Sequence, residues 1–157
     1  MSSTARAPRK FLVVVDKTPE SKVAIRFATR RAMATEGRVT LLCVAQHADF
    51  QQWRGVEEIM KDEAHQEAES LIYEAAKAVN EMSGIVCELV IADGRVMDAL
   101  MSLLKDDSDI SILVLAASTA KEGPGPLVAT VANTGHYPIP VTIVPGSLSD
   151  DEIDALA

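Results

Sequence analysis

The sequence predicts an α/β fold, a single open five-stranded parallel sheet with helices on both faces. Apolar runs of strand length alternate along the 157 residues with stretches of helical periodicity. Most of these runs are apolar throughout, which is typical of parallel strands that are buried on both faces. The length suits one domain with a substantial core. We therefore expect a βαβαβαβαβ chain with helices covering the sheet.

The first strand and helix have clear boundary signals. The run 10–15 is β-branched and ends at Asp16. Thr18 then predicts an N-cap, and Pro19 suits the first helical position. Gly37 predicts the end of this helix, since glycine readily adopts the left-handed conformation that closes helices.

A second strand at 38–45 and a loop over 46–54 precede the strongest helical pattern in the chain. Apolar residues recur there at steps of three or four over about 28 residues, which corresponds to roughly 40 Å of helix. Gly84 closes this helix. Its apolar stripe consists of Val56, Met60, Ala64, Ala68, Leu71, Ala75, Val79 and Met82.

The second half of the chain continues the alternation. The expected elements are a strand at 85–92, a turn at Asp93-Gly94, a helix with Met97, Leu100, Met101 and Leu104 on its buried face, a strand at 110–116, a loop at 117–125, a helix at 126–134 that Gly135 ends, and a last strand at 140–144. The chain thus divides into a disordered lead at 1–9, the α/β domain at 10–145, and an acidic tail at 146–157 with a helical turn at 150–156.

Composition excludes several classes of function. The net charge of −8 argues against binding to nucleic acid or to an anionic membrane surface. No apolar run reaches the roughly 20 residues that span a bilayer, and the first residues lack a signal sequence, so a cytoplasmic protein is expected. Cys43 and Cys87 lie in apolar runs and are expected to be buried thiols. Arg26, Arg30 and Arg31 are interpreted as the solvated face of a helix.

Candidate binding residues gather where strands end, because open parallel sheets bind ligands beyond the carboxyl ends of their strands. Asp16 follows the first strand, Val44 lies at the end of the second, and Thr130 lies near the start of the helix after the fourth. A carboxylate could accept hydrogen bonds from ribose or adenine, and a helix N-terminus could hold phosphates. The pattern suggests an adenine-nucleotide site.

The order and spacing of these segments resemble the universal stress protein family over roughly residues 10–145. The resemblance implies a strand order of 3-2-1-4-5, an adenine nucleotide alpha hydrolase-like fold, stress-response roles in the cytosol, frequent homodimers, and ATP binding in one subgroup. The segments that carry it are Phe11-Leu-Val-Val-Val-Asp16, the long second helix, Val90-Ile-Ala-Asp-Gly94, Ile112-Leu-Val-Leu-Ala116 and Pro138-Ile-Pro-Val-Thr-Ile-Val144.

The ATP-binding subgroup has the pattern G-x2-G-x9-G-[ST] after its fourth strand. In this chain the three glycine positions fall on Ala116, Thr119 and Ala129, and only the hydroxyl position, Thr130, matches. Glycine permits a positive φ or a close approach of the phosphate, so we expect Thr119 to be strained by about 1–3 kcal/mol and the alanine methyls to crowd a ligand. The family's nucleotide contacts would carry over to Asp16, Val44, Thr130 and Val131.

Two other glycines, Gly123 and Gly125, alternate with Pro124 and Pro126 in the same loop. They could form a different anion-binding nest, or simply a stiff turn that leads into the helix. Both interpretations stay open, and the turn is favoured.

The sequence therefore predicts a dimeric, non-enzymatic stress-response or regulatory domain without a functional ATP site. The alternative is an adenine-nucleotide-binding member with altered loop geometry, and a slow ATPase or a phosphotransfer receiver is a weaker one. Asp93 could serve as a receiver's phosphoacceptor, but strand 140–144 ends without the lysine that such a site needs. That strand would be an open apolar edge, so it is expected to pair with a second copy.

Overall fold

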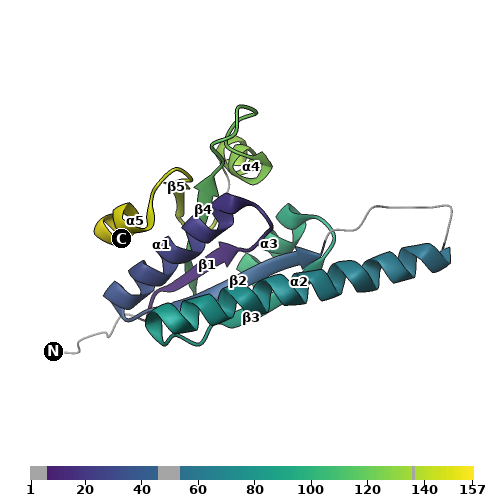
Figure 1. Ribbon diagram of the computed structural model, residues 1–157, viewed down its shortest axis with the longest axis horizontal. Helices are drawn as coiled ribbons and strands as arrows, with labels where there is room; N and C mark the ends of the chain where they lie inside the picture. Colours follow the sequence, from purple (N-terminus) through teal and green to yellow (C-terminus); the bar gives the residue numbers. More distant parts are fainter. Residues whose placement is uncertain (1–6, 46–53, 136) are drawn as a thin grey trace.

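The computed structural model describes residues 7–45, 54–135 and 137–157. Its five described strands are all parallel and lie in the order β3-β2-β1-β4-β5 (Figure 1), which confirms the predicted fold class and strand order. The elements are β1 (Lys10–Val14), α1 (Pro19–Thr35), β2 (Arg38–Ala45), α2 (Arg54–Ser83), β3 (Glu88–Asp93), α3 (Val96–Asp106), β4 (Ile110–Ala117), α4 (Pro126–Thr134), β5 (Val141–Pro145) and α5 (Asp150–Leu156).

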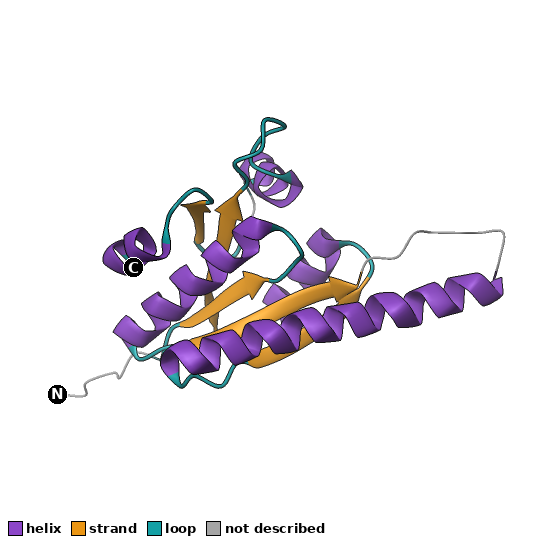
Figure 2. Cartoon of the chain, viewed as in Figure 1, coloured by secondary structure: helices purple, strands orange, loops and turns teal. Residues whose placement is uncertain are grey.

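The sheet separates two apolar cores, and successive residues of β1 point into them alternately. Phe11 and Val13 pack with α1 and α2 on one face, whereas Leu12 and Val14 pack with α3 and α4 on the other. Helices therefore cover both faces of the sheet (Figure 2). This arrangement explains why β1 is buried along its whole length.

Helix α2 buries much of its predicted stripe and then outruns the sheet. Ala68, Ala75 and Val79 are buried as expected, while Ile72, which the predicted stripe omitted, is fully buried as well. The amino-terminal half of the helix extends past the end of β2 (Figure 1). The side chain of Val56 lies outside the described residues, as do residues 46–53 of the predicted loop at 46–54, whose last residue, Arg54, begins α2.

The edge strands differ most from their predicted bounds. Strand β3 begins at Glu88 rather than at residue 85, because the chain first turns through Gly84 and the Ile85 N–H donates to the Ser83 hydroxyl at 3.1 Å. Strand β5 is displaced by one residue from the predicted 140–144, and the Pro140 carbonyl just before it accepts a hydrogen bond from the Leu113 N–H. Both strands have only one described neighbour and are partly exposed.

The segment predicted as an acidic tail packs against the domain. The helical turn expected at 150–156 forms α5, with reciprocal 3.2 Å hydrogen bonds between Ser149 and Glu152 at its start. Ile153 is fully buried, and α5 lies against α1. The prediction of a solvated arginine face is wrong for Arg26 and Arg30, because both pair with Asp154 of this helix.

Two searches of the described residues gave no candidates. None of the described helices is long and apolar enough to cross a membrane. No group of three or more described His, Cys, Asp or Glu residues is placed to hold a metal ion.

Candidate functional site

A cavity of about 130 Å³ opens at the carboxyl ends of β1 and β4. It lies between the turn that leads into α1 and the first turn of α4. This is the point where the strand order reverses, at which open α/β sheets bind their ligands. Asp16, Ala116 and Gly125 of the predicted site residues line it.

The turn after β1 is held by Asp16. Its Oδ1 accepts hydrogen bonds from the Thr18 N–H at 2.9 Å and from the Thr18 hydroxyl. The Asp16 N–H donates to the hydroxyl oxygen of Ser21 at 3.2 Å. One carboxylate oxygen is therefore committed to the turn in the manner of an Asx-turn, and α1 begins without a side-chain cap from Thr18.

The charged groups in the cavity wall are acidic. Asp16 and Glu20 both line it, and its described lining includes no lysine or arginine. The neighbouring Lys17 pairs with Glu67 of α2 instead. An opening of this charge disfavours a phosphate group, because two carboxylates would face it without a cation.

The loop after β4 takes a path that differs from the expectation for Thr119. Among the described non-glycine residues only Glu36 has a positive φ, so Thr119 is not strained in the way the sequence suggested. The positive φ values fall on Gly123 and Gly125, at 112° and 101°. The Ser118 N–H donates to the Pro124 carbonyl at 2.9 Å, which closes the loop on itself.

The start of α4 determines what the predicted hydroxyl can do. Gly125 is the N-cap and Pro126 the first helical residue, so Thr130 lies in the second turn. Its hydroxyl donates to the Pro126 carbonyl at 2.7 Å, within the helix. The Ala129 N–H donates to the Gly125 carbonyl at 3.0 Å. The N–H groups of Leu127 and Val128 belong to the first turn, where a helix offers them no partner of its own, and both residues line the cavity.

The remaining predicted residues lie elsewhere. Val131 is buried in the core beneath α3 and α4, and Val44 packs against that core. The residues Thr119, Gly123, Ala129 and Thr130 are not part of the cavity lining. Sequence reasoning missed Glu20 and Ser21, which do line it. Both residues follow closely after Asp16 in the sequence, which could have placed them near the same site. An acid and a serine are also ordinary residues at a helix start, so nothing in the sequence singled them out.

The thiols and the remaining strand-end carboxylate stand apart from this cavity. Burial, with smaller contributions from Asp16 and Glu67, raises the pKa of Cys43 to about 11. Burial also raises the pKa of Cys87 to about 11, so both thiols are protonated at neutral pH. Asp93 ends the edge strand β3. Because β2 lies between β3 and β1, Asp93 is two strand spacings, about 10 Å, from the line of β1, where the cavity opens.

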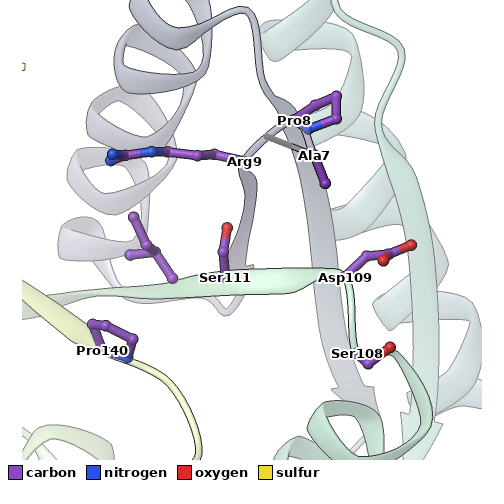
Figure 3. A pocket seen from close by; sticks show the side chains of 8 residues that line it. Ala7, Pro8, Arg9, Ser108, Asp109, Ser111 and Pro140 are labelled. Atoms are coloured by element: carbon purple, nitrogen blue, oxygen red, sulfur yellow. The ribbon is translucent and has the colours of Figure 1, made fainter. Parts of the chain in front are cut away.

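A larger cavity, of about 500 Å³, lies at the opposite, amino-terminal end of β1 and β4 (Figure 3). The register of β1 and β4 shifts there, and the Ser111 hydroxyl accepts the Lys10 N–H at 2.9 Å. The side chains of Arg9 and Asp109 extend toward opposite sides of the opening (Figure 3). Its charged groups therefore do not converge on one ligand.

The strand order and the cavity at its reversal define a doubly wound α/β protein of the kind that binds ligands at a switch point. The model of the Universal stress protein family matches residues 8–145, so this chain belongs to that family, as the sequence resemblance indicated. No curated protein matches the chain in sequence.

Solved structures of the family share this fold. Universal stress protein UspA from Lactobacillus plantarum is 20% identical, with a TM-score of 0.75 over 90% of this chain and 99% of that one. A family protein from Arabidopsis thaliana with AMP bound is 18% identical, with a TM-score of 0.60 over 88% and 92% of the two chains. The universal stress protein from Archaeoglobus fulgidus in complex with dAMP is 16% identical, with a TM-score of 0.57 over 88% and 99%.

Proposed function

We propose that this protein is a non-catalytic regulatory domain of the universal stress type, active in the cytoplasm as a homodimer and without a functional ATP site. The family provides the stress-response role. The cavity at the β1 and β4 strand ends supports the absence of an ATP site, since it is too small and too acidic for a triphosphate.

The size and charge of this cavity carry the proposal. Small-molecule sites commonly measure about 300–1,000 Å³, whereas this one measures about 130 Å³. Asp16 and Glu20 would repel phosphates, and the Thr130 hydroxyl is already bonded within α4. A triphosphate would need a wider opening and a cation that the described wall does not offer.

A second candidate is binding of an adenine nucleotide in an altered geometry. The first turn of α4 supports it, because the N–H groups of Leu127 and Val128 adjoin the cavity next to Gly125. The AMP-bound and dAMP-bound relatives have the same fold and carry only one phosphate. A monophosphate is therefore the nucleotide to compare with ATP.

Calorimetric titration with Mg-ATP and with AMP tests the two candidates. We expect no saturable heat with either nucleotide at millimolar concentration, while the AMP-binding Arabidopsis thaliana relative serves as the positive control. The variant Glu20→Gln, which removes one carboxylate from the wall, is the matched test of the charge argument and should give a larger binding heat with Mg-ATP than the wild type if the carboxylates disfavour phosphate. A Kd below about 100 µM for wild-type protein, which is about −5.5 kcal/mol, would overturn the proposal.

Pairing through β5 is the second part of the proposal. Both β3 and β5 are edge strands, but β3 has carboxylates at its two ends, Glu88 and Asp93. Two copies of β3 side by side would bring these acids together, whereas β5 has no charged residue. Ile143 of β5 is 43% exposed, which leaves an apolar side chain beside the open edge.

A further inference from the structure

The two sides of the cavity at the β1 and β4 strand ends come from different elements. The turn into α1 and the start of that helix supply one side, with the carboxylates of Asp16 and Glu20. The loop before α4 and its first turn supply the other side, with Leu127 and Val128. Helices α1 and α4 pack on opposite faces of the sheet. The cavity therefore lies between an acidic side and a side of backbone donors.

The acidic side has no cation of its own. Oδ1 of Asp16 accepts two hydrogen bonds from Thr18, whereas Oδ2 has no partner among the described residues. Glu20 is partly buried, and its carboxylate has no hydrogen bond or ion pair within the described part of the chain. Lys17, which is next to Asp16 in sequence, pairs with Glu67. This side of the cavity therefore favours a positively charged group.

The opposite side has backbone N–H groups that α4 does not use. The first hydrogen bond into the helix runs from the Ala129 N–H to the Gly125 carbonyl, so the N–H groups of Leu127 and Val128 precede it. Gly125 provides no side-chain cap. Val128 is only 7% exposed, and a buried N–H needs an acceptor. The start of this nine-residue helix therefore favours a carboxylate or another small anion.

The strand residues between these two sides are apolar. Val14 and Leu115 are 8% and 4% exposed, and they line the cavity together with Ala116. The volume of about 130 Å³ suits a ligand far smaller than a nucleotide. A small molecule with a cationic end, an anionic end and an aliphatic part matches all three surfaces. A nucleotide does not, because its phosphates bring negative charge without a cation for the carboxylates.

We propose that this cavity binds a small aliphatic amino acid, which carries both charges at neutral pH. Its ammonium group pairs with the carboxylates of Asp16 and Glu20. Its carboxylate accepts hydrogen bonds from the N–H groups of Leu127 and Val128, and its side chain contacts the apolar strand residues. The ligand thus brings no net charge into the cavity. The inference rests on the proposed function, because a cavity that held ATP would have no room for this ligand.

Calorimetric titration of the full-length protein with L-valine tests the proposal. We expect a saturable heat with a Kd of about 1 mM, since a ligand of so few atoms gains only modest affinity. Isobutylamine lacks the carboxylate of valine, and isovalerate lacks its ammonium group. Each should bind at least about ten-fold more weakly, because one charged contact is lost. No saturable heat with L-valine up to about 20 mM, or equal affinity for all three ligands, would overturn the proposal.

Two further measurements locate the ligand. Glu20→Gln should weaken L-valine binding about five-fold, whereas Glu122→Gln, which removes an exposed carboxylate outside the cavity lining, should bind like wild type. In NMR titrations, L-valine should shift the amide protons of Leu127 and Val128 more than isobutylamine does. The Ala129 amide, which is already bonded to the Gly125 carbonyl, is the internal control and should shift less. Equal effects of the two glutamate variants would overturn the assignment to this cavity.

The titrations with ATP and L-valine fail independently. Protein that binds neither ligand would overturn this inference and leave the proposed function standing. Binding of ATP with a Kd below about 100 µM would overturn the proposed function, whatever the result with L-valine. Glu20→Gln should have opposite effects on the two ligands, because the carboxylate that disfavours phosphate is the one that pairs with the ammonium group.

Discussion

At the residue scale, the least expected side chain is Lys10. It is 4% exposed at the start of β1, and its Nζ lies 2.5 Å from both Glu88 Oε2 and Asp107 Oδ2. Burial lowers the pKa of Lys10, but its hydrogen bonds to Asp107 and Glu88 outweigh burial and leave the pKa above 10.5. The same bond to Lys10 lowers the pKa of Asp107 below 3.8. This triad ties β1 to β3 and to the turn before β4.

Replacing this lysine should lower stability in a pH-dependent way. Lys10→Met leaves two carboxylates without their cation, and since both are partly hydrated we expect a loss of about 2–3 kcal/mol in the free energy of unfolding. Because Asp107 has a lowered pKa, its stabilisation is present above pH 3.8 and is lost as the pH falls through the folded value. Lys10 contributes below pH 10.5 and loses its contribution as the pH rises through its raised value.

Urea denaturation across pH measures both effects. The wild-type protein should lose stability more steeply below about pH 4 than Lys10→Met does, because the hydrogen bond from Lys10 is the largest cause of the lowered Asp107 pKa and is absent from the variant. Asp107→Asn, which keeps the pair between Lys10 and Glu88, is the control and should lose about 1 kcal/mol. Equal free energies of unfolding for wild type and Lys10→Met would contradict a stabilising triad.

At the element scale, the end of α1 shows how a local pattern can mislead by one residue. The sequence placed the left-handed residue at Gly37, but the structure places it at Glu36, with φ of 53°. Gly37 is needed for another reason. A Cβ on it would lie 2.5 Å from the Arg9 carbonyl oxygen, so this residue must be glycine to let α1 reach β2 beside the start of β1. A contact with residue 9 is not visible in the local pattern that ends a helix.

This difference predicts two opposite mutational effects. Glu36→Gly should stabilise the protein by about 0.5–1 kcal/mol, because glycine adopts a positive φ without the strain of a side chain. Gly37→Ala should destabilise it by about 1–3 kcal/mol, since the backbone must shift away from the Arg9 carbonyl. Thermal unfolding monitored by circular dichroism measures both. If Gly37→Ala left the melting temperature unchanged or raised it, the close approach to the Arg9 carbonyl would not limit this position.

At the scale of the whole molecule, the alternation of apolar strands and helices was enough to predict a parallel sheet with helices on both faces, and the family resemblance implied the strand order and so the two edge strands. The same information did not predict the attachment of α5, because Arg26 and Asp154 are 128 residues apart and no periodic pattern connects them. The position of the cavity at the strand ends was predicted, but several of the residues that line it were not. Asp16 was expected at a strand end and Gly125 in the loop before the helix. Glu20 looked like an ordinary first-turn acid, and the loop path through Gly123 depends on the closing hydrogen bond from the Ser118 N–H to the Pro124 carbonyl.

The two edges of the sheet allow a direct test of assembly. We expect a dimer that forms by pairing of β5 with its symmetry mate, since β5 is uncharged and β3 is not. Ile143→Lys puts a like charge on both sides of such an interface and should yield monomers at micromolar concentration in sedimentation experiments. Leu89→Lys, on a β3 side chain of similar exposure at 37%, is the matched control and should remain a dimer. A wild-type protein that sediments as a monomer would contradict the dimer itself, and dissociation by Leu89→Lys alone would move the interface to β3.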